Sequence, residues 1–132
     1  MRILVCGGRD YDDRKTVWQV LDLWNNTQGI NVLIHGGATG ADQLAVLWAQ
    51  QHRVPRLGFY AEWDLYGPSA GPRRNERMLE EGKPNVVLAF PRKNGRIGEG
   101  TADMVRRARA AGVRVVEPVQ EPLPGLVRRL VT

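Results

Sequence analysis

Three short glycine-bearing segments each come directly behind, or a few residues after, an apolar run. They are Gly-Gly-Arg-Asp at residues 7–10, Gly-Gly-Ala-Thr-Gly-Ala-Asp at 36–42 and Gly-Glu-Gly-Thr at 98–101. An apolar strand, then glycines, then a helical pattern presents bare backbone N–H groups at a helix N-terminus, where phosphate binds. Three such segments in one short chain predict a nucleotide or sugar-phosphate site built from several strand ends.

The segment 36–42 is the strongest of these signals. Its glycines let the backbone approach a ligand closely, Thr39 adds a hydroxyl, and Ala41 begins a helix whose dipole favours an anion. Asp42 would repel a phosphate, so it suits hydrogen bonding to ribose hydroxyls or holding the glycine loop in place. The alternative is a plain tight turn. Neither Gly-x-Gly-x-x-Gly after the first strand nor a P-loop Gly-Lys-Ser/Thr is present.

Two arginines beside these loops are candidates for contact with an anion. Arg9 could bind phosphate as a fork oriented by Asp10, or the two form a surface pair. Arg74 is a candidate phosphate or transition-state contact. Its neighbour Asn75 shares a helix face with Met78, so its amide either bonds neighbouring loops or touches ligand.

The start of the last helix and a long loop complete the set of candidates. Thr101 is a candidate N-cap followed by exposed N–H groups, or a cap on a flexible loop. Trp63 and Tyr66 could stack on a base or simply pin their loop down. His35, at a strand end, fits a structural role better than catalysis.

The candidate ligand-binding residues are Gly7, Gly8, Arg9, Asp10, Gly36, Gly37, Thr39, Gly40, Asp42, Arg74, Asn75, Gly98, Gly100 and Thr101, and Arg74 is also the candidate catalytic residue. We expect no metal, because no Cys/His cluster has metal-binding spacing, and no other cofactor.

The elements that must position these residues alternate strictly. Strands are predicted at 2–6, 31–35, 57–60, 85–90 and 113–116, and helices at 13–25, 41–52, 72–81 and 101–111, with a long loop at 61–71. Continuous apolar strands between amphipathic helices predict an α/β, doubly wound, Rossmann-like three-layer sandwich around a parallel sheet of about five strands. The expected order is 3-2-1-4-5, with the loops at 7–10 and 91–101 flanking the crevice at the switch point.

Composition sets the outer limits. The 132 residues carry a net charge of +5 and a single cysteine, Cys6, which we read as a small core residue. We expect a cytoplasmic protein without signal peptide or membrane span. We expect residues 1–117 to form one domain and the extension 118–132 to end in a short amphipathic pattern that docks on the core or on a second subunit. We also expect a homodimer. Scattered arginines such as Arg107 are expected on solvated faces.

Together these segments resemble the SLOG superfamily, the Rossmann-like group that includes the LOG phosphoribohydrolases and the DNA-processing protein DprA. The similarity is closest to the YspA/YpsA-related branch and spans residues 7–104. It rests on the three glycine segments and on Gly-Pro-Arg-Arg-Asn-Glu-Arg-Met at 71–78.

The resemblance implies a catalytic arginine at Arg74, where LOG proteins carry Arg-Lys-x-x-Met, but Asn75 replaces the lysine. LOG proteins also place a catalytic glutamate where this chain has Met104. Methionine can neither stabilise an oxocarbenium-like centre nor activate water. Asp103 is adjacent, but one residue along a helix is a turn of about 100°, so it should point elsewhere.

We therefore predict a module that binds a nucleotide or nucleotide-derived ligand, with phosphate held by the 36–42 and 98–101 loops, in a sensor or processing role. A phosphoribohydrolase is the alternative, with Glu99, Asp103 or Asp42 as its carboxylate. A DprA-like single-strand DNA binder is a third interpretation, drawn from the positive charge. No membrane partner is expected.

Overall fold

The computed structural model describes residues 1–119 and contains a five-stranded parallel sheet. Its strands are β1 (Arg2–Cys6), β2 (Val32–His35), β3 (Arg56–Gly58), β4 (Val86–Ala89) and β5 (Arg114–Val116). The order β3-β2-β1-β4-β5 confirms the predicted 3-2-1-4-5 arrangement. Every neighbouring pair is parallel, for example β1 with β4, where Ile3 is in register with Val86.

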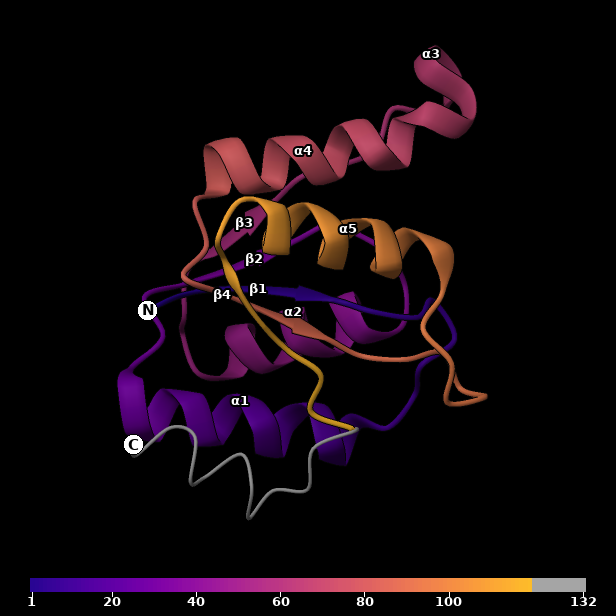
Figure 1. Cartoon of the computed structure of the whole chain (residues 1–132). Coiled ribbons are helices and arrows are strands. Elements are labelled where there is room, and N and C mark those ends of the chain that lie inside the picture. Colours follow the sequence, from indigo (N-terminus) through magenta and orange to yellow (C-terminus); the bar gives the residue numbers. More distant parts are fainter. Residues whose placement is uncertain (120–132) are drawn as a thin grey trace.

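Four long helices cover the sheet in two layers. They are α1 (Arg14–Gln28), α2 (Ala41–Gln51), α4 (Ala70–Gly82) and α5 (Glu99–Ala110). Figure 1 shows α1 and α2 on one face and α4 and α5 on the other, which is the expected three-layer α/β sandwich. No helix within residues 1–119 is long and apolar enough to cross a membrane.

The strands bury side chains on both faces, so the core consists of two clusters. Ile3 and Val5 of β1 point toward α1 and α2, where Trp24 and Trp48 are fully buried. Leu4 and Cys6 point the other way and pack with α4 and α5. This alternation explains why the three central strands, β1, β2 and β4, read as nearly continuous apolar runs, whereas the edge strands β3 and β5 each begin with an exposed arginine.

The loops predicted to flank an open crevice are in direct contact. Gly8 N–H donates to the Pro91 carbonyl at 3.3 Å, and Lys93 N–H donates to Asp10 Oδ1 at 2.9 Å. A Cβ at Gly8 would lie 2.5 Å from the Arg92 Cα, so only glycine allows this approach. The crevice between residues 7–10 and 91–101 is therefore closed at this point by backbone.

Several predicted boundaries were wrong. Helix α1 ends at Gln28, three residues later than predicted, and strand β3 ends at Gly58, two residues earlier than predicted. Residues 61–71 are not a plain loop: they contain the short helix α3 (Trp63–Tyr66), a 3-10 turn (Gly67–Ser69) and the start of α4 at Ala70. Pro72 is tolerated there because the N–H groups of a helix's first turn have no intrahelical partner. Helix α5 begins at Glu99, two residues earlier than predicted. The domain limits at 1–117 and 118–132 stay a prediction, because the amphipathic pattern near the C-terminus lies outside the described residues.

Candidate functional site

The loop after β2 is held closed by a buried carboxylate. Asp42, in the first turn of α2, accepts hydrogen bonds from Gly36 N–H at 2.8 Å and Ala38 N–H at 3.4 Å. Gly37 N–H donates to His35 Nδ1 at 3.0 Å. The sequence suggested that Asp42 either bonds ribose hydroxyls or holds the glycine loop in place. These hydrogen bonds support the second role. The N–H groups of residues 36–38 therefore point inward and are already used.

The environment of Asp42 is strongly perturbed. Burial raises the pKa of its carboxyl from 3.8 to about 6, against the opposing effects of the two backbone N–H donors and of the Arg74 and Arg9 guanidinium groups. Burial also raises the pKa of the Cys6 thiol, so this cysteine is a neutral core residue and not a nucleophile. Burial lowers the pKa of His35, with Arg56 acting in the same direction.

The first two glycine loops are packed against each other. Thr39 Oγ1 donates to the Arg9 carbonyl at 3.0 Å, and Ala41 N–H donates to the Gly8 carbonyl at 3.3 Å. Gly40 has φ of +75°, and a Cβ there would lie 2.1 Å from the Gly8 carbonyl oxygen. Position 40 thus requires glycine for two reasons: the positive φ, and the lack of room for a Cβ.

Arg74 lies against the closed loop. Its Nη1 donates to the Gly36 carbonyl at 2.7 Å and its Nε to Asn75 Oδ1 at 3.1 Å. The buried Asn75 amide in turn donates to the Gly100 carbonyl at 3.1 Å and to Asp103 Oδ2 at 2.9 Å. These bonds support the structural alternative for Asn75, since both ends of its amide are occupied by protein.

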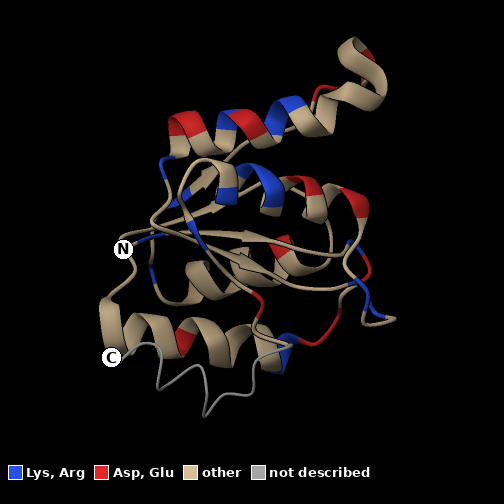
Figure 2. Ribbon diagram, viewed as in Figure 1, with Lys and Arg blue, Asp and Glu red and all other residues tan. Residues whose placement is uncertain are grey.

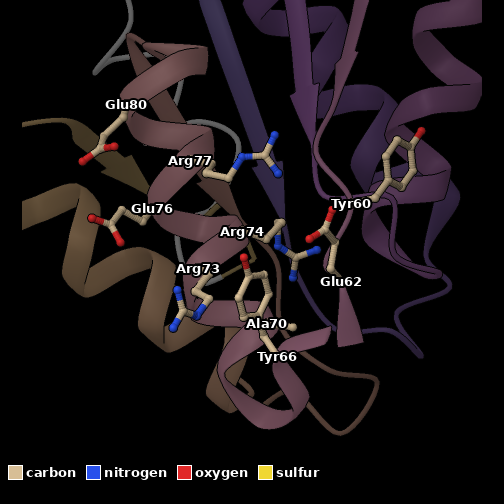
Figure 3. Close-up of a pocket in the computed structure, with 9 residues that line it drawn as sticks. All are labelled: Tyr60, Glu62, Tyr66, Ala70, Arg73, Arg74, Glu76, Arg77 and Glu80. Atoms are coloured by element: carbon tan, nitrogen blue, oxygen red, sulfur yellow. The ribbon is translucent and has the colours of Figure 1, made fainter. Parts of the chain in front are cut away.

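A cavity of about 510 Å³ opens beside Arg74, between α4 and the segment that follows β3 (Figure 3). It is lined by Tyr60, Glu62, Tyr66, Ala70, Arg73, Arg74, Glu76, Arg77 and Glu80. Figure 3 shows the Arg74 guanidinium directed toward the side on which Tyr60 and Glu62 lie. The lining thus combines three arginines with three glutamates and two tyrosine rings.

Two of the three arginines are engaged elsewhere. Arg73 stacks over the Tyr66 ring at 4.3 Å and donates to Ser69 Oγ at 3.2 Å. Arg77 pairs with Glu81 at 3.0 Å. Arg73 and Arg77 are exposed, whereas Arg74 is half-buried, and its guanidinium keeps further N–H donors that make no hydrogen bond to residues 1–119. Burial lowers its pKa, with the Asp42 carboxylate opposing, but an arginine stays charged.

The predicted site residues of the first two glycine segments and of α4 divide into three groups. Gly36, Arg74 and Asn75 lie at or directly behind the cavity wall. Gly7, Gly8, Gly37, Thr39, Gly40 and Asp42 hold the loops behind them together. Arg9 stacks over Trp63 at 5.4 Å, and Asp10 is bound to the Lys93 backbone.

The third glycine segment starts α5 and does not line the cavity. Gly98 is the N-cap, while Thr101 is buried in the first turn, so the N-cap prediction for Thr101 was wrong. Thr101 cannot cap because it already has helical backbone. The N–H groups of Glu99, Gly100 and Thr101 make no hydrogen bond within the described part of the chain.

Tyr60 and Glu62 were missed as candidates. Both follow β3 at the carboxyl edge of the sheet, and that placement is the signal that could have found them. The Tyr60 ring lies over Gly37 and meets His35 edge-on, with ring centroids 6.2 Å apart. Tyr60 stays 65% exposed, so one face is available to a ligand.

The position that matches the LOG glutamate is core. Met104 is fully buried against β1 and β4, and so offers nothing to the cavity. Asp103 lies between α4 and α5, where it accepts from Asn75 and from Arg107 Nε at 2.9 Å. Arg107 is therefore an ion-pair partner and not simply solvated, which corrects the prediction from sequence. Within residues 1–119, no three His, Cys, Asp or Glu side chains are grouped to hold a metal.

Comparisons with known proteins point to one family. The sequence profile of the family described as "YspA, cpYpsA-related SLOG family" matches residues 1–66. The Gene 61 protein of Mycobacterium phage D29 is 39% identical over 129 residues, which covers 92% of this chain and 98% of that protein. DNA processing protein A (DprA) from Streptococcus pneumoniae has a similar solved structure, with a TM-score of 0.52 and 16% identity over 87% of this chain. The match spans 58% of that DprA chain, and at this identity the likeness concerns the fold.

Proposed function

The chain belongs to the YspA, cpYpsA-related SLOG family, and from this premise we propose that it binds a nucleotide or a nucleotide-derived ligand in the cavity beside α4. A nucleoside phosphate or an ADP-ribose-like compound is the expected class, in a sensor or processing role. The observation that carries the proposal is Arg74, a half-buried arginine with unused N–H donors at the wall of a cavity of about 510 Å³.

The cavity suits a ligand with two chemically different ends. Its volume falls within the range of small-molecule sites, about 300–1,000 Å³. A phosphate fits beside Arg74, because guanidinium groups bind phosphate oxygens with charge-assisted hydrogen bonds. Glu62 and Glu76 would repel a second anion but accept hydrogen bonds from ribose hydroxyls or base amino groups. The exposed face of Tyr60 offers a stacking surface for a base.

The phosphate contact that we propose, Arg74, differs from the contacts predicted from the sequence, which were the loops at 36–42 and 98–101. The N–H groups of residues 36–38 are occupied by Asp42 and His35, so phosphate would have to displace those side chains to bind there. The first turn of α5 keeps unbonded N–H groups and remains a second candidate for phosphate. Arg74 is the contact on which we rest the proposal.

Calorimetry tests the proposal with AMP, ADP-ribose, NAD and ribose 5-phosphate. We expect heat of binding for at least one of them, and a loss of about 1.5–3 kcal/mol of binding free energy in Arg74→Ala, the value of a charge-assisted hydrogen bond. Arg109→Ala is the matched control, because the Arg109 side chain is exposed on α5 and makes no hydrogen bond or ion pair with residues 1–119. Absence of heat for all four ligands at millimolar concentration would refute the proposal.

A phosphoribohydrolase is a second candidate, favoured by one observation: Glu62 and Glu76 share the cavity with Arg74. Of the carboxylates named from sequence, Asp42 and Asp103 are bound to protein groups, and Glu99 is exposed at the start of α5. Base release from AMP, followed by chromatography and abolished in both Arg74→Ala and Glu62→Gln, would establish this activity. Unchanged AMP after prolonged incubation would exclude it.

Binding of single-stranded DNA is a third candidate, suggested by the fold shared with DprA and by the net charge of +5. Affinity for an oligonucleotide should then fall steeply between low and moderate salt, because binding releases counterions. Absent or salt-independent binding would dispose of it.

A further inference from the structure

A continuous line of side-chain hydrogen bonds joins α5 to Arg74 on α4. Arg107 Nε donates to Asp103 Oδ2 at 2.9 Å, and Asn75 Nδ2 donates to the same oxygen, also at 2.9 Å. Arg74 Nε then donates to Asn75 Oδ1 at 3.1 Å. The line thus begins at a half-exposed ion pair and ends on the arginine at the cavity wall.

The chemistry of the line allows Asn75 only one orientation. Its neighbours on one side are acceptors only, the Asp103 carboxylate and the Gly100 carbonyl, and its neighbour on the other is a donor only, the Arg74 guanidinium. The amide NH₂ must therefore face α5 and the amide oxygen must face Arg74. The hydrogen bond to the Asp103 carboxylate holds the Asn75 amide in this orientation, so that Asn75 Oδ1 is the acceptor for Arg74 Nε.

The opposite side of the guanidinium is fixed by the closed loop. Arg74 Nη1 donates to the Gly36 carbonyl at 2.7 Å. A Cβ at Gly36 would lie 2.5 Å from that same Nη1, and Gly36 does not have a left-handed backbone. A Cβ at Gly36 would thus push the Arg74 guanidinium out of its place, while the turn itself does not require glycine.

We propose that Asp103, acting through Asn75, and Gly36 are positioning elements that hold the Arg74 guanidinium with its remaining N–H groups toward the cavity. This inference rests on the proposed function and names the part of the fold that prepares the phosphate contact. A long side chain loses rotamer entropy when it binds an anion, and a guanidinium already held at two atoms has less to lose. Asp103 touches no ligand itself.

The test combines AMP affinity with the NMR signal of the Arg74 Nε–Hε group, assigned by its disappearance in Arg74→Ala. Asp103→Ala should speed solvent exchange of this signal and weaken AMP binding roughly threefold to tenfold. Asp103→Asn keeps an acceptor oxygen and should restore most of both. Gly36→Ala should weaken AMP binding from the other side without changing any charge, and thermal melting verifies that each variant is folded.

Arg109→Ala, six residues after Asp103 and exposed on α5, should leave the signal and the affinity unchanged. An unchanged Nε–Hε signal in Asp103→Ala, or wild-type AMP affinity in both Asp103→Ala and Gly36→Ala, would overturn the positioning role. If Arg74→Ala still lost affinity in that case, the proposed function would stand. If Arg74→Ala also bound AMP normally, both would fall.

Discussion

Asp42 blocks phosphate binding at the loop of residues 36–42, which was the strongest predicted phosphate site in the sequence. Its buried carboxylate occupies the place at the start of α2 where an anion would otherwise meet the Gly36 and Ala38 N–H groups. The protein therefore supplies its own anion to this loop. Under the proposed function, the ligand therefore binds groups that face the cavity, of which Arg74 is the best placed.

The raised pKa of Asp42 has a consequence for stability. Because the pKa is about 6 in the folded state and near 3.8 when unfolded, the folded state binds more protons between these values. Stability from this group is therefore greatest below pH 4 and declines as pH rises through 6. Over the whole titration, the free energy of unfolding changes by about 3 kcal/mol, because the two pKa values differ by about two units.

Asp42→Asn removes this titration while keeping an acceptor oxygen for the loop. We expect the free energy of unfolding of wild type to rise by about 2 kcal/mol relative to that of Asp42→Asn when the pH falls from 7 to 4. Urea unfolding of both proteins at the two pH values measures the difference. A difference of the opposite sign would mean that Arg74 and the N–H donors outweigh burial and depress this pKa.

Met104 separates this chain from LOG-type chemistry. Because its side chain is fully buried, Met104→Glu would place a carboxylate in the core, which we expect to cost about 3 kcal/mol or more without creating base release. Met104→Leu, of similar volume, should cost less than about 1.5 kcal/mol. Thermal melting and chromatography of AMP check the two parts. A stable Met104→Glu that cleaves AMP would contradict this placement.

Among the elements, the sheet could be predicted from the sequence because its central strands β1, β2 and β4 are apolar on both faces and each long helix is apolar on one. Ile3 and Leu4 are both fully buried, which only a sheet covered on two sides allows. With helical crossovers of one hand, the arrangement 3-2-1-4-5 was the natural solution. The same pattern carries no information about where side chains of different helices meet.

The contacts that define the candidate site are tertiary, and so could not be predicted. Nothing near Asn75 in sequence indicates that its partners are Gly100 and Asp103, 25 and 28 residues away. Tyr60 and Glu62 gain their place only because β3 ends early and α4 lies opposite. Local glycine patterns located the loops correctly but could not tell a closed loop from an open one.

Two glycines at the starts of helices should respond oppositely to the same change. Gly40→Ala should destabilise by at least about 2 kcal/mol, because Gly40 has positive φ and abuts the Gly8 carbonyl. Gly100→Ala should be neutral or stabilise by up to about 1 kcal/mol, since Gly100 is within α5 and a Cβ there would meet no atom of residues 1–119 within 4 Å. Urea unfolding compares them. Equal effects would mean that one of the loops is misplaced.

Across the whole protein, charged residues of both signs are mixed on α4, whereas exposed apolar side chains are concentrated around α3. Figure 2 shows basic and acidic residues alternating along α4, so the net positive charge is not gathered on that helix. Most of the large exposed apolar side chains of residues 1–119, by contrast, lie in one segment, with Tyr60, Trp63, Leu65 and Tyr66 all at least 41% exposed, while Leu47 and Val119 lie elsewhere. α3 projects from the body of the protein in Figure 1.

The homodimer expected from the sequence stays a prediction, and this segment is the surface on which we expect it. Sedimentation equilibrium should give twice the chain mass of 14.8 kDa for wild type. Leu65→Glu, 67% exposed and so free of folding cost, should shift the mass toward the monomer. A monomeric wild type at high concentration would refute the dimer.

A crystal structure of the protein soaked with AMP tests the central claim most directly. We expect a phosphate oxygen about 2.7–3.2 Å from a guanidinium nitrogen of Arg74, with the adenosine moiety in the cavity along Tyr60. The Asp42 carboxylate should still accept from Gly36 N–H. AMP bound away from Arg74, or its phosphate seated on the N–H groups of residues 36–38 after displacing Asp42, would contradict the claim.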